Sequence, residues 1–496
     1  MKKVTIIGAG ISGLSAGIFG RKLGFDTEIY EMHSIPGGEC TGWNRNGYHF
    51  DNCIHWLTGT KKETDLYKIW SELGALKNTE VYNFDYLFSV KHNNQTLYLY
   101  KDINKLKQHL LEISPEDRKE ILEFINIVKK IQKLTMPTKK PMDMMNFFDY
   151  IKLSKDFGAF SKHIIQLNKL SIEEYSSKFK STIIRRAFIE GLPNGYSSAA
   201  LFFELGTFTS ENGGWPKGGS LAMALRMEKE YKALGGKIRY NSKVKRIIIE
   251  NGAAKAIELE DGEIISGDYL IPAVDANMLM NNFLENKYRD KVFDTQFNNP
   301  EKYHIHSSVN IGLGVKCDLS KRDHSASFEV EPFKCGELMV NTIGIKHYCH
   351  EESFSPKGCS VIRINILCND YDYWKNLKKN DKNQYYDEKE NIAKEIMLRV
   401  EKIYPETKGN FEVYDVCTPV TYERYCGAYK GAWMGFDLTP KVKNLMHKGR
   451  INGIDNLYTA GQWEMMPGGL PSACLAGKWA IQRICKKERI KFTFKY

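Results

Sequence analysis

The feature that most constrains this chain is a glycine-rich turn between a short apolar run and a helix near the N-terminus. Val4-Thr5-Ile6-Ile7 is typical of a buried strand, and Gly8-Ala9-Gly10-Ile11-Ser12-Gly13 follows it directly and opens a helix that runs to Gly24. Glu31 lies 18 residues after Gly13, at the end of the next expected strand. Together these parts predict a dinucleotide-binding βαβ unit, in which the Glu31 carboxylate accepts hydrogen bonds from ribose hydroxyls.

Each position of this turn has a mechanical reason. Gly8 permits the tight turn, Gly10 lets the backbone approach a pyrophosphate, and Gly13 lets the helix pack closely on the strand. The first helical residues, Ile11 and Ser12, present the amides and the positive end of the helix dipole to the phosphates.

The residues after the second expected strand distinguish between dinucleotides. Ile35-Pro36-Gly37-Gly38, followed by Gly47-Tyr48-His49-Phe50-Asp51, resembles the extended flavin-binding segment of the large FAD-dependent oxidoreductase family. The resemblance implies that Gly37 and Gly38 pass beside the pyrophosphate and ribityl chain of the cofactor. FAD, and neither FMN nor NAD, is therefore the expected tightly held cofactor.

Two distant segments narrow the resemblance to one branch of that family. Gly214-Trp215-Pro216-Lys217-Gly218-Gly219-Ser220 is similar to the middle motif of the phytoene desaturase and carotenoid isomerase (retinol saturase-like) branch. Asn456–Trp463, followed by Pro467–Ala473, resembles the closing motif of the same branch. The resemblance implies that the backbone near Val244 contacts the adenine end of FAD. It also implies flavin contacts for Gly461, Gln462, Gly469, Leu470 and Pro471.

Two positions depart from the usual pattern of this branch. Glu39 stands where the family often has Arg or Lys, and Gln462 stands where an Asp usually holds a ribityl hydroxyl. A glutamine side chain still hydrogen-bonds a hydroxyl but brings no charge. FAD binding is therefore expected to persist, while the subfamily and the substrate stay open.

The resemblance implies redox chemistry on the flavin, with the protein supplying position and electrostatics. The candidates for catalytic residues are His55, Lys217 and Trp463. The alternative is packing under the sheet for His55 and plain solvent exposure for Lys217. The first hypothesis is an enzyme that desaturates, saturates or isomerises carbon–carbon double bonds of a long apolar substrate, such as a carotenoid, retinoid or other lipid. The alternatives are a fatty-acid isomerase or hydratase, an amine oxidase, or a flavin-binding, membrane-associated protein without turnover.

The expected fold class is α/β, with a discontinuous Rossmann-type FAD-binding domain over 1–75, 211–290 and 440–496. A helical cap is expected over 76–210 and a strand-rich, mixed α+β substrate domain over 291–439. Apolar periodicity predicts helices within 101–135, and Asn251-Gly252 and Asp261-Gly262 predict hairpin turns. The polar stretch Lys375–Tyr386 is expected to be a surface loop.

Positive charge and large apolar side chains are concentrated in one segment. The chain has a net charge of +11, and 129–186 contains 13 Lys and Arg against 5 Asp and Glu. The same segment carries Met142, Phe147, Phe148, Tyr150, Ile151, Phe157 and Phe160. This composition fits either a surface that lies on a bilayer or a solvated cap over a substrate tunnel. Nucleic acid is not an expected partner, because no recognised binding module occurs.

Cysteine usage bears on compartment and metal binding. None of the 11 cysteines forms a Cys-x-x-Cys pair, so no metal site is expected. Free thiols in a chain of this length are typical of the reducing cytoplasm. The expected location is therefore the cytoplasm, with peripheral contact to the inner face of the membrane if the basic segment binds lipid.

Overall fold

The computed structural model describes residues 1–134, 136–440 and 442–493, and the side chains of all of these except 156, 157 and 159–162. Phe157 and Phe160, which contribute to the apolar character expected of the basic segment, therefore lie outside the described side chains.

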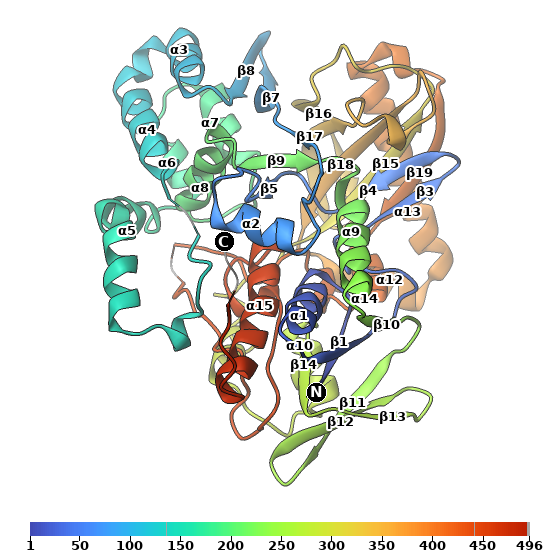
Figure 1. The fold of residues 1–496 in the computed structure, drawn as a ribbon. Coiled ribbons are helices and arrows are strands. Elements are labelled where there is room, and N and C mark those ends of the chain that lie inside the picture. The colour runs from blue at the N-terminus through green and yellow to red at the C-terminus, as the bar shows by residue number, and fades with distance from the viewer. Residues whose placement is uncertain (135, 441, 494–496) are drawn as a thin grey trace.

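The N-terminal motif forms the centre of a parallel sheet. The sheet has four strands, in the spatial order β10 (Lys237–Arg239), β2 (Asp26–Tyr30), β1 (Lys3–Ile7) and β14 (Tyr269–Pro272). These strands come from segments far apart in the chain and lie together at the lower centre of Figure 1. The expected Rossmann-type α/β fold is confirmed.

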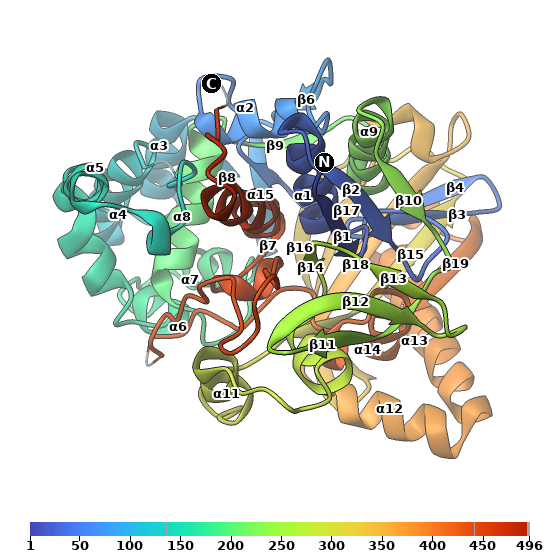
Figure 2. The same ribbon diagram turned by 60° about the horizontal axis from the view of Figure 1, so that its bottom comes forward.

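Two helices from opposite ends of the chain pack against each other on this sheet. Helix α1 (Ile11–Lys22) has ten of its 12 residues buried, and it lies beside α15 (Leu470–Lys487) in both views (Figures 1 and 2). The Ser15 hydroxyl donates to the Cys474 carbonyl at 2.7 Å. A Cβ at Gly477 would lie 2.2 Å from the Ser12 carbonyl oxygen, so the close approach of the helices requires glycine there.

The middle motif leads into helix α9 (Gly219–Ala233), which also covers the parallel sheet. After β10 come three more strands: β11 (Val244–Glu250), β12 (Ala253–Leu259) and β13 (Ile264–Ser266). They form an antiparallel meander. The two expected hairpin turns are confirmed, and Gly252 and Gly262 have φ values of +73° and +91°, which favour glycine.

A second sheet of seven strands lies beside the parallel sheet (Figure 1, upper right). Its spatial order is β19 (Phe411–Cys417), β15 (Ser307–Val315), β18 (Ser360–Cys368), β17 (Leu338–His347), β16 (Ser325–Cys335), β7 (Tyr86–His92) and β8 (Gln95–Tyr100). All neighbours pair antiparallel except β16 and β7. The β7–β8 hairpin comes from the segment expected to be a helical cap, so that segment is not helical throughout. The domain limits themselves stay a prediction.

Helices fill the rest of that cap, at the upper left of Figure 1. They are α3 (Ile103–Ile113), α4 (Arg118–Ile131), α5 (Phe147–Leu167), α6 (Ile172–Ser176), α7 (Thr182–Ile189) and α8 (Ser198–Thr209). The helical periodicity within 101–135 is confirmed as α3 and α4. Within the described residues, no helix combines the length and the apolar character that crossing a membrane requires.

The prediction of a surface loop over Lys375–Tyr386 is wrong. This stretch lies in α12 (Tyr371–Asn380) and α13 (Lys382–Ile403). Its polar composition conceals Tyr385, which is buried in the core of the seven-stranded sheet with Trp374, the residue just before the stretch. The Asp381 carboxylate accepts a hydrogen bond from the Gln384 N–H and so caps the start of α13.

Candidate functional site

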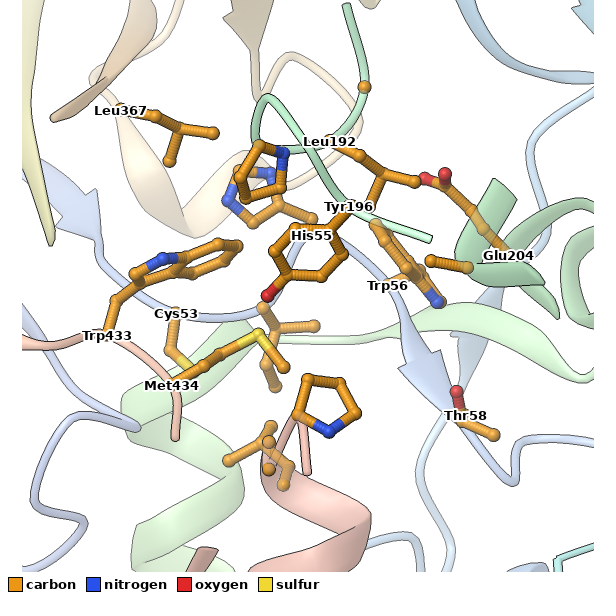
Figure 3. Close-up of a pocket in the computed structure, with 18 of the residues that line it drawn as sticks. Cys53, His55, Trp56, Thr58, Leu192, Tyr196, Glu204, Leu367, Trp433 and Met434 are labelled. Atoms are coloured by element: carbon orange, nitrogen blue, oxygen red, sulfur yellow. The ribbon is translucent and has the colours of Figure 1, made fainter. Parts of the chain in front are cut away.

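The parallel sheet, the helical cap and the seven-stranded sheet surround one cavity of 1360 Å³. Ligand sites in proteins usually measure about 300–1,000 Å³, so this cavity has room for more than one small molecule. Its walls come from the glycine turn after β1, the loop before α15, the cap helices and the strands β16–β18. Figure 3 shows its central part, where His55, Tyr196 and Trp433 lie around a common space.

One end of the cavity is a cradle formed by Gly10, Ile11, Ser12, Gly37 and Gly38. A Cβ at Gly10 would meet no protein atom closer than 3.9 Å, so the space in front of this residue is open. The Ser12 hydroxyl is buried and has no hydrogen-bond partner among the described residues. An open backbone, an orphaned hydroxyl and the start of α1 together fit a pyrophosphate group.

Gly8 and Gly13 lie just behind this cradle and explain its shape. A Cβ at Gly13 would lie 1.9 Å from the Gly8 carbonyl oxygen, which confirms that the helix packs too closely for any other residue. Gly8 has a φ of +97°, as its tight turn requires.

Glu31 holds the glycine turn in place. Its carboxylate accepts hydrogen bonds from the Ala9 N–H at 2.6 Å and the His33 N–H at 2.8 Å. Burial raises the pKa of this carboxyl. The expected contact of Glu31 with a ribose stays a prediction, as does the contact of Val244 with adenine. Val244 begins β11 and packs in a core beside Ile7 and Tyr30.

The closing motif forms another part of the cavity wall. Gly461, Gln462, Gly469, Leu470 and Pro471 all line the cavity, so the start of α15 faces it as the start of α1 does. Two helix N-termini therefore direct partial positive charge into one cavity.

Gln462 joins the closing motif to the segment after β2. Its carbonyl Oε1 accepts from the Gly469 N–H at 3.0 Å, and its Nε2 donates to Glu39 at 3.4 Å. Burial, and secondarily the Asp275 carboxylate, raise the pKa of Glu39 to about 8. The two departures from the usual flavin pattern are thus in direct contact.

The structure brings two of the three catalytic candidates to the cavity. His55 lines it, and burial lowers the pKa of this imidazole well below its usual value, so the ring is neutral. Trp463 also lines it, with its ring packed against Phe436 and Phe297. Lys217 does not line it.

The candidate role of Lys217 is therefore wrong. Its backbone N–H donates to the Glu80 carbonyl at 2.9 Å, and its exposed ammonium pairs with the Glu80 carboxylate at 3.1 Å. These contacts hold the side chain at the surface, where it faces solvent.

Sequence reasoning missed two cations of the cavity wall, Lys346 and Arg363. The Lys346 ammonium donates to the His55 carbonyl at 3.3 Å, and burial together with the nearby Arg363 lowers its pKa to about 7. The Arg363 guanidinium donates to Asn310 and to the Asn52 carbonyl, while its Nη1 has no hydrogen-bond partner among the described residues. The sequence does contain one signal for Arg363, since a charged residue stands inside the apolar run Val361–Leu367. No comparable feature of the sequence marks Lys346 as a residue of the cavity.

Asp51 connects this region to the middle motif. Its carboxylate accepts from the Ser220 N–H at 2.7 Å and from the Ser220 hydroxyl at 2.9 Å. Burial raises the pKa of Asp51 to about 6. These bonds fix the segment Gly47–Asp51 against the start of α9.

The other end of the cavity, between the cap and the seven-stranded sheet, is mainly apolar. The residues that give it this character are Leu134, Ile164, Leu167, Leu192, Phe203, Phe208, Leu338, Ile366 and Leu367. Glu204 is an acid within this apolar wall, and sequence reasoning also missed it. No group of three or more metal-ligating side chains suited to an ion occurs in the described part of the chain.

Comparison with known proteins gives one family. The sequence matches, over residues 11–485, the family described as "Flavin containing amine oxidoreductase". A 4,4'-diapophytoene desaturase from Methylomonas sp is 23% identical, over 99% of this chain and 96% of the relative.

Two further relatives and a solved structure are similar over most of their length. The chloroplastic prolycopene isomerase of Daucus carota is 23% identical, over 97% of this chain and 79% of the relative. The all-trans-retinol 13,14-reductase of Danio rerio is 23% identical, over 96% of this chain and 86% of the relative. The crystal structure of an oxidoreductase from Methanosarcina mazei has the same fold, with a TM-score of 0.58, 15% identity and coverage of 97% and 100%.

Proposed function

Because this chain belongs to the flavin containing amine oxidoreductase family and is an FAD-dependent oxidoreductase, we propose that it changes carbon–carbon double bonds of a long apolar substrate. The reaction is a desaturation, a saturation or an isomerisation, the three activities for which its full-length relatives are named. The observation that carries the proposal is that one cavity joins a pyrophosphate-shaped cradle to an apolar chamber.

The residues divide the work along this cavity. Gly10, Ser12 and the starts of α1 and α15 hold the cofactor. When bound, the flavin would accept a hydride in a desaturation or donate one in a saturation, whereas an isomerisation transfers no net hydride. Lys346 and Arg363 place positive charge in the same wall, which favours an anionic, reduced state of the cofactor. The apolar chamber binds the chain of the substrate and excludes water from it.

The test uses the purified holoprotein. It should be yellow and release FAD on denaturation, and a long linear polyene should change its flavin spectrum and leave a product with altered double bonds. A saturated chain of equal length serves as the control for mere binding. A colourless protein that cannot be reconstituted with FAD would overturn the proposal. Flavin turnover with amines but with no polyene would do the same.

We further propose that the protein takes this substrate from an anionic membrane surface, at the cytoplasmic face. Helix α5 begins with Phe147 and Phe148, whose side chains are 73% and 78% exposed. Lys152 and Lys155 are exposed on the same helix. The segment that leads to α5 lines the cavity at Met136 and Pro137, so an apolar, basic surface lies close along the chain to the chamber. This composition suits contact with acyl chains and anionic headgroups.

A further inference from the structure

Glu204 interrupts an apolar stripe on the cavity-facing side of α8. Ala200, Phe203, Glu204 and Phe208 all line the cavity, at the spacing that places residues on one face of a helix. The Glu204 side chain is only 5% exposed. Figure 3 shows its carboxyl group directed toward Leu192, above the central part of the cavity.

The Glu204 carboxyl makes no hydrogen bond or ion pair with any described residue. It lies against the backbone at Gly191, where a Cβ would be 3.6 Å from Glu204 Oε2. Other acids of the cavity wall have protein partners. Glu190 pairs with Arg186 at 2.6 Å, and Asp275 accepts from the Tyr429 N–H at 2.9 Å. A buried polar group without a partner costs stability. We therefore expect the Glu204 carboxyl to hydrogen-bond a group that the protein itself does not supply.

The protonation state of Glu204 limits what that partner is. Burial raises the pKa of this carboxyl to about 8, so the group is neutral at pH 7. A neutral carboxylic acid both donates and accepts a hydrogen bond. A hydroxyl group complements both functions, while the apolar residues around Glu204 suit a hydrocarbon chain.

We propose that the substrate is an apolar chain with a hydroxyl group, and that this hydroxyl hydrogen-bonds to Glu204. Glu204 is then a positioning residue, because a fixed end determines which double bond of the chain lies beside the cofactor. The inference rests on the proposed function, since it names a group on the same substrate.

The test compares two ligands of equal carbon number, a linear polyene hydrocarbon and its terminal alcohol. Their affinities for the holoprotein are measured by quenching of flavin fluorescence. The wild-type protein should bind the alcohol about tenfold more tightly, the effect of one buried hydrogen bond. Glu204→Leu should bind both ligands within about twofold and keep its affinity for the hydrocarbon. Glu204→Gln, which is less disruptive, should keep part of the preference.

Two further measurements and a control variant make the result specific. FAD content reports whether each variant folds, and Glu123→Leu removes an exposed acid from the neighbouring helix α4 as a matched control. With the alcohol as substrate, the wild-type product should be altered at one position, whereas Glu204→Leu should give a mixture of positions. A merely structural role for Glu204 would lower turnover without mixing the products.

The outcomes separate this inference from the proposed function. Equal binding of both ligands by the wild-type protein, or an unchanged preference in both Glu204 variants, overturns the inference and leaves the proposed function intact. Tighter binding of the corresponding amine than of the alcohol also overturns it. If neither polyene binds or alters the flavin spectrum, the proposed function fails and the inference fails with it.

Discussion

Gln462 donates a hydrogen bond through its Nε2 to Glu39, although the two residues are 423 positions apart in the chain. They are the two positions that depart from the usual flavin-binding pattern, which has a basic residue at the first and an Asp at the second. A neutral amide at 462 can donate to the Glu39 carboxyl, whose pKa is already raised, whereas a carboxylate there could not donate and would oppose the ionisation of Glu39 further. The departures are therefore complementary.

Gln462→Asp should consequently reduce both FAD content and the melting temperature, because it puts a further carboxyl group, with no cation among the described residues to pair with it, beside the buried acids Glu39 and Asp275. The double variant Glu39→Lys with Gln462→Asp should recover both properties, since it restores a pair of opposite charges. Thermal unfolding and the absorbance of bound flavin provide the two measurements. Full flavin occupancy and an unchanged melting temperature in the single variant would contradict the interpretation.

Gly10 and Gly13 should respond differently to substitution. Gly10→Val should fold but lose FAD, because its side chain enters open space where the pyrophosphate binds. Gly13→Ala should instead destabilise the fold, because its Cβ would lie 1.9 Å from the Gly8 carbonyl oxygen. Circular dichroism and flavin absorbance distinguish the two effects. Retention of flavin by Gly10→Val would show that the cradle is not the site.

Ser12→Ala should weaken FAD binding without lowering the stability of the apoprotein. The Ser12 hydroxyl has no partner among the described residues, so its removal breaks no bond within the protein. A hydrogen bond to a charged phosphate contributes about 1.5–3 kcal/mol, which corresponds to a loss of affinity of about tenfold or more. Ser15→Ala is the matched control. It removes the 2.7 Å bond to the Cys474 carbonyl and should lower stability rather than affinity.

Ionisation of Glu39 should make the apoprotein lose stability as the pH rises from 5 to 7. The pKa of Glu39 is raised from 4.5 to about 8, so between these values the folded state holds a proton that the unfolded state releases. The contribution of Glu39 to the free energy of unfolding therefore decreases with pH in this window, opposite to that of buried neutral histidines such as His55. Glu39→Gln removes the titrating group, so the change in melting temperature from pH 5 to pH 7 should be more favourable in this variant than in the wild-type protein. An identical slope in both proteins would assign the effect to other acids such as Asp275.

Binding to anionic liposomes should depend on the surface of α5. Phe147→Ser with Phe148→Ser should reduce co-sedimentation at all salt concentrations, because buried apolar surface is not screened. Lys152→Glu with Lys155→Glu should reduce it mainly at low salt, at about 1 kcal/mol per charge.

One control and the choice of target residues make this experiment specific. Lys379→Glu with Lys382→Glu changes the same number of exposed charges on α12 and α13 and should have no effect. Lys139 and Lys140 are less suitable targets, since Lys140 pairs at 2.7 Å with Asp149 in the first turn of α5. If the α5 variants bind like the wild-type protein, the surface is a solvated cap.

The sequence predicts what depends on short-range spacing. The turn from β1 into α1 and the hairpins between β11 and β13 follow from residues within a few positions of one another, and their local geometry does not depend on the remaining chain. Polar composition hid the helices over Lys375–Tyr386, because Tyr385 is the only buried residue within that stretch, while Tyr371 and Trp374 lie just before it. A single acid on a helix usually faces water, so nothing near Glu204 in the sequence indicated a cavity.

Lys346 and Arg363 show most clearly which part of the site the sequence does not predict. Lys346 lies in β17 and Arg363 in β18, and they meet His55 only because the seven-stranded sheet packs beside the parallel one. That packing arises only in the tertiary structure. The sequence therefore does not predict a contact between residues nearly 300 positions apart.

The packing of α1 on α15 has a consequence for the order of events on the ribosome. Roughly 450 residues must be translated after α1 before α15 exists, which takes about 20–90 s at 5–20 residues per second. Throughout that interval the apolar surface that α1 later buries against α15, including the contact at Ser15, has no native partner. Until α15 is made, this surface is open to aggregation or to chaperone binding. A chain stalled before Leu470 keeps the surface exposed and lacks the α15 residues of the cavity wall.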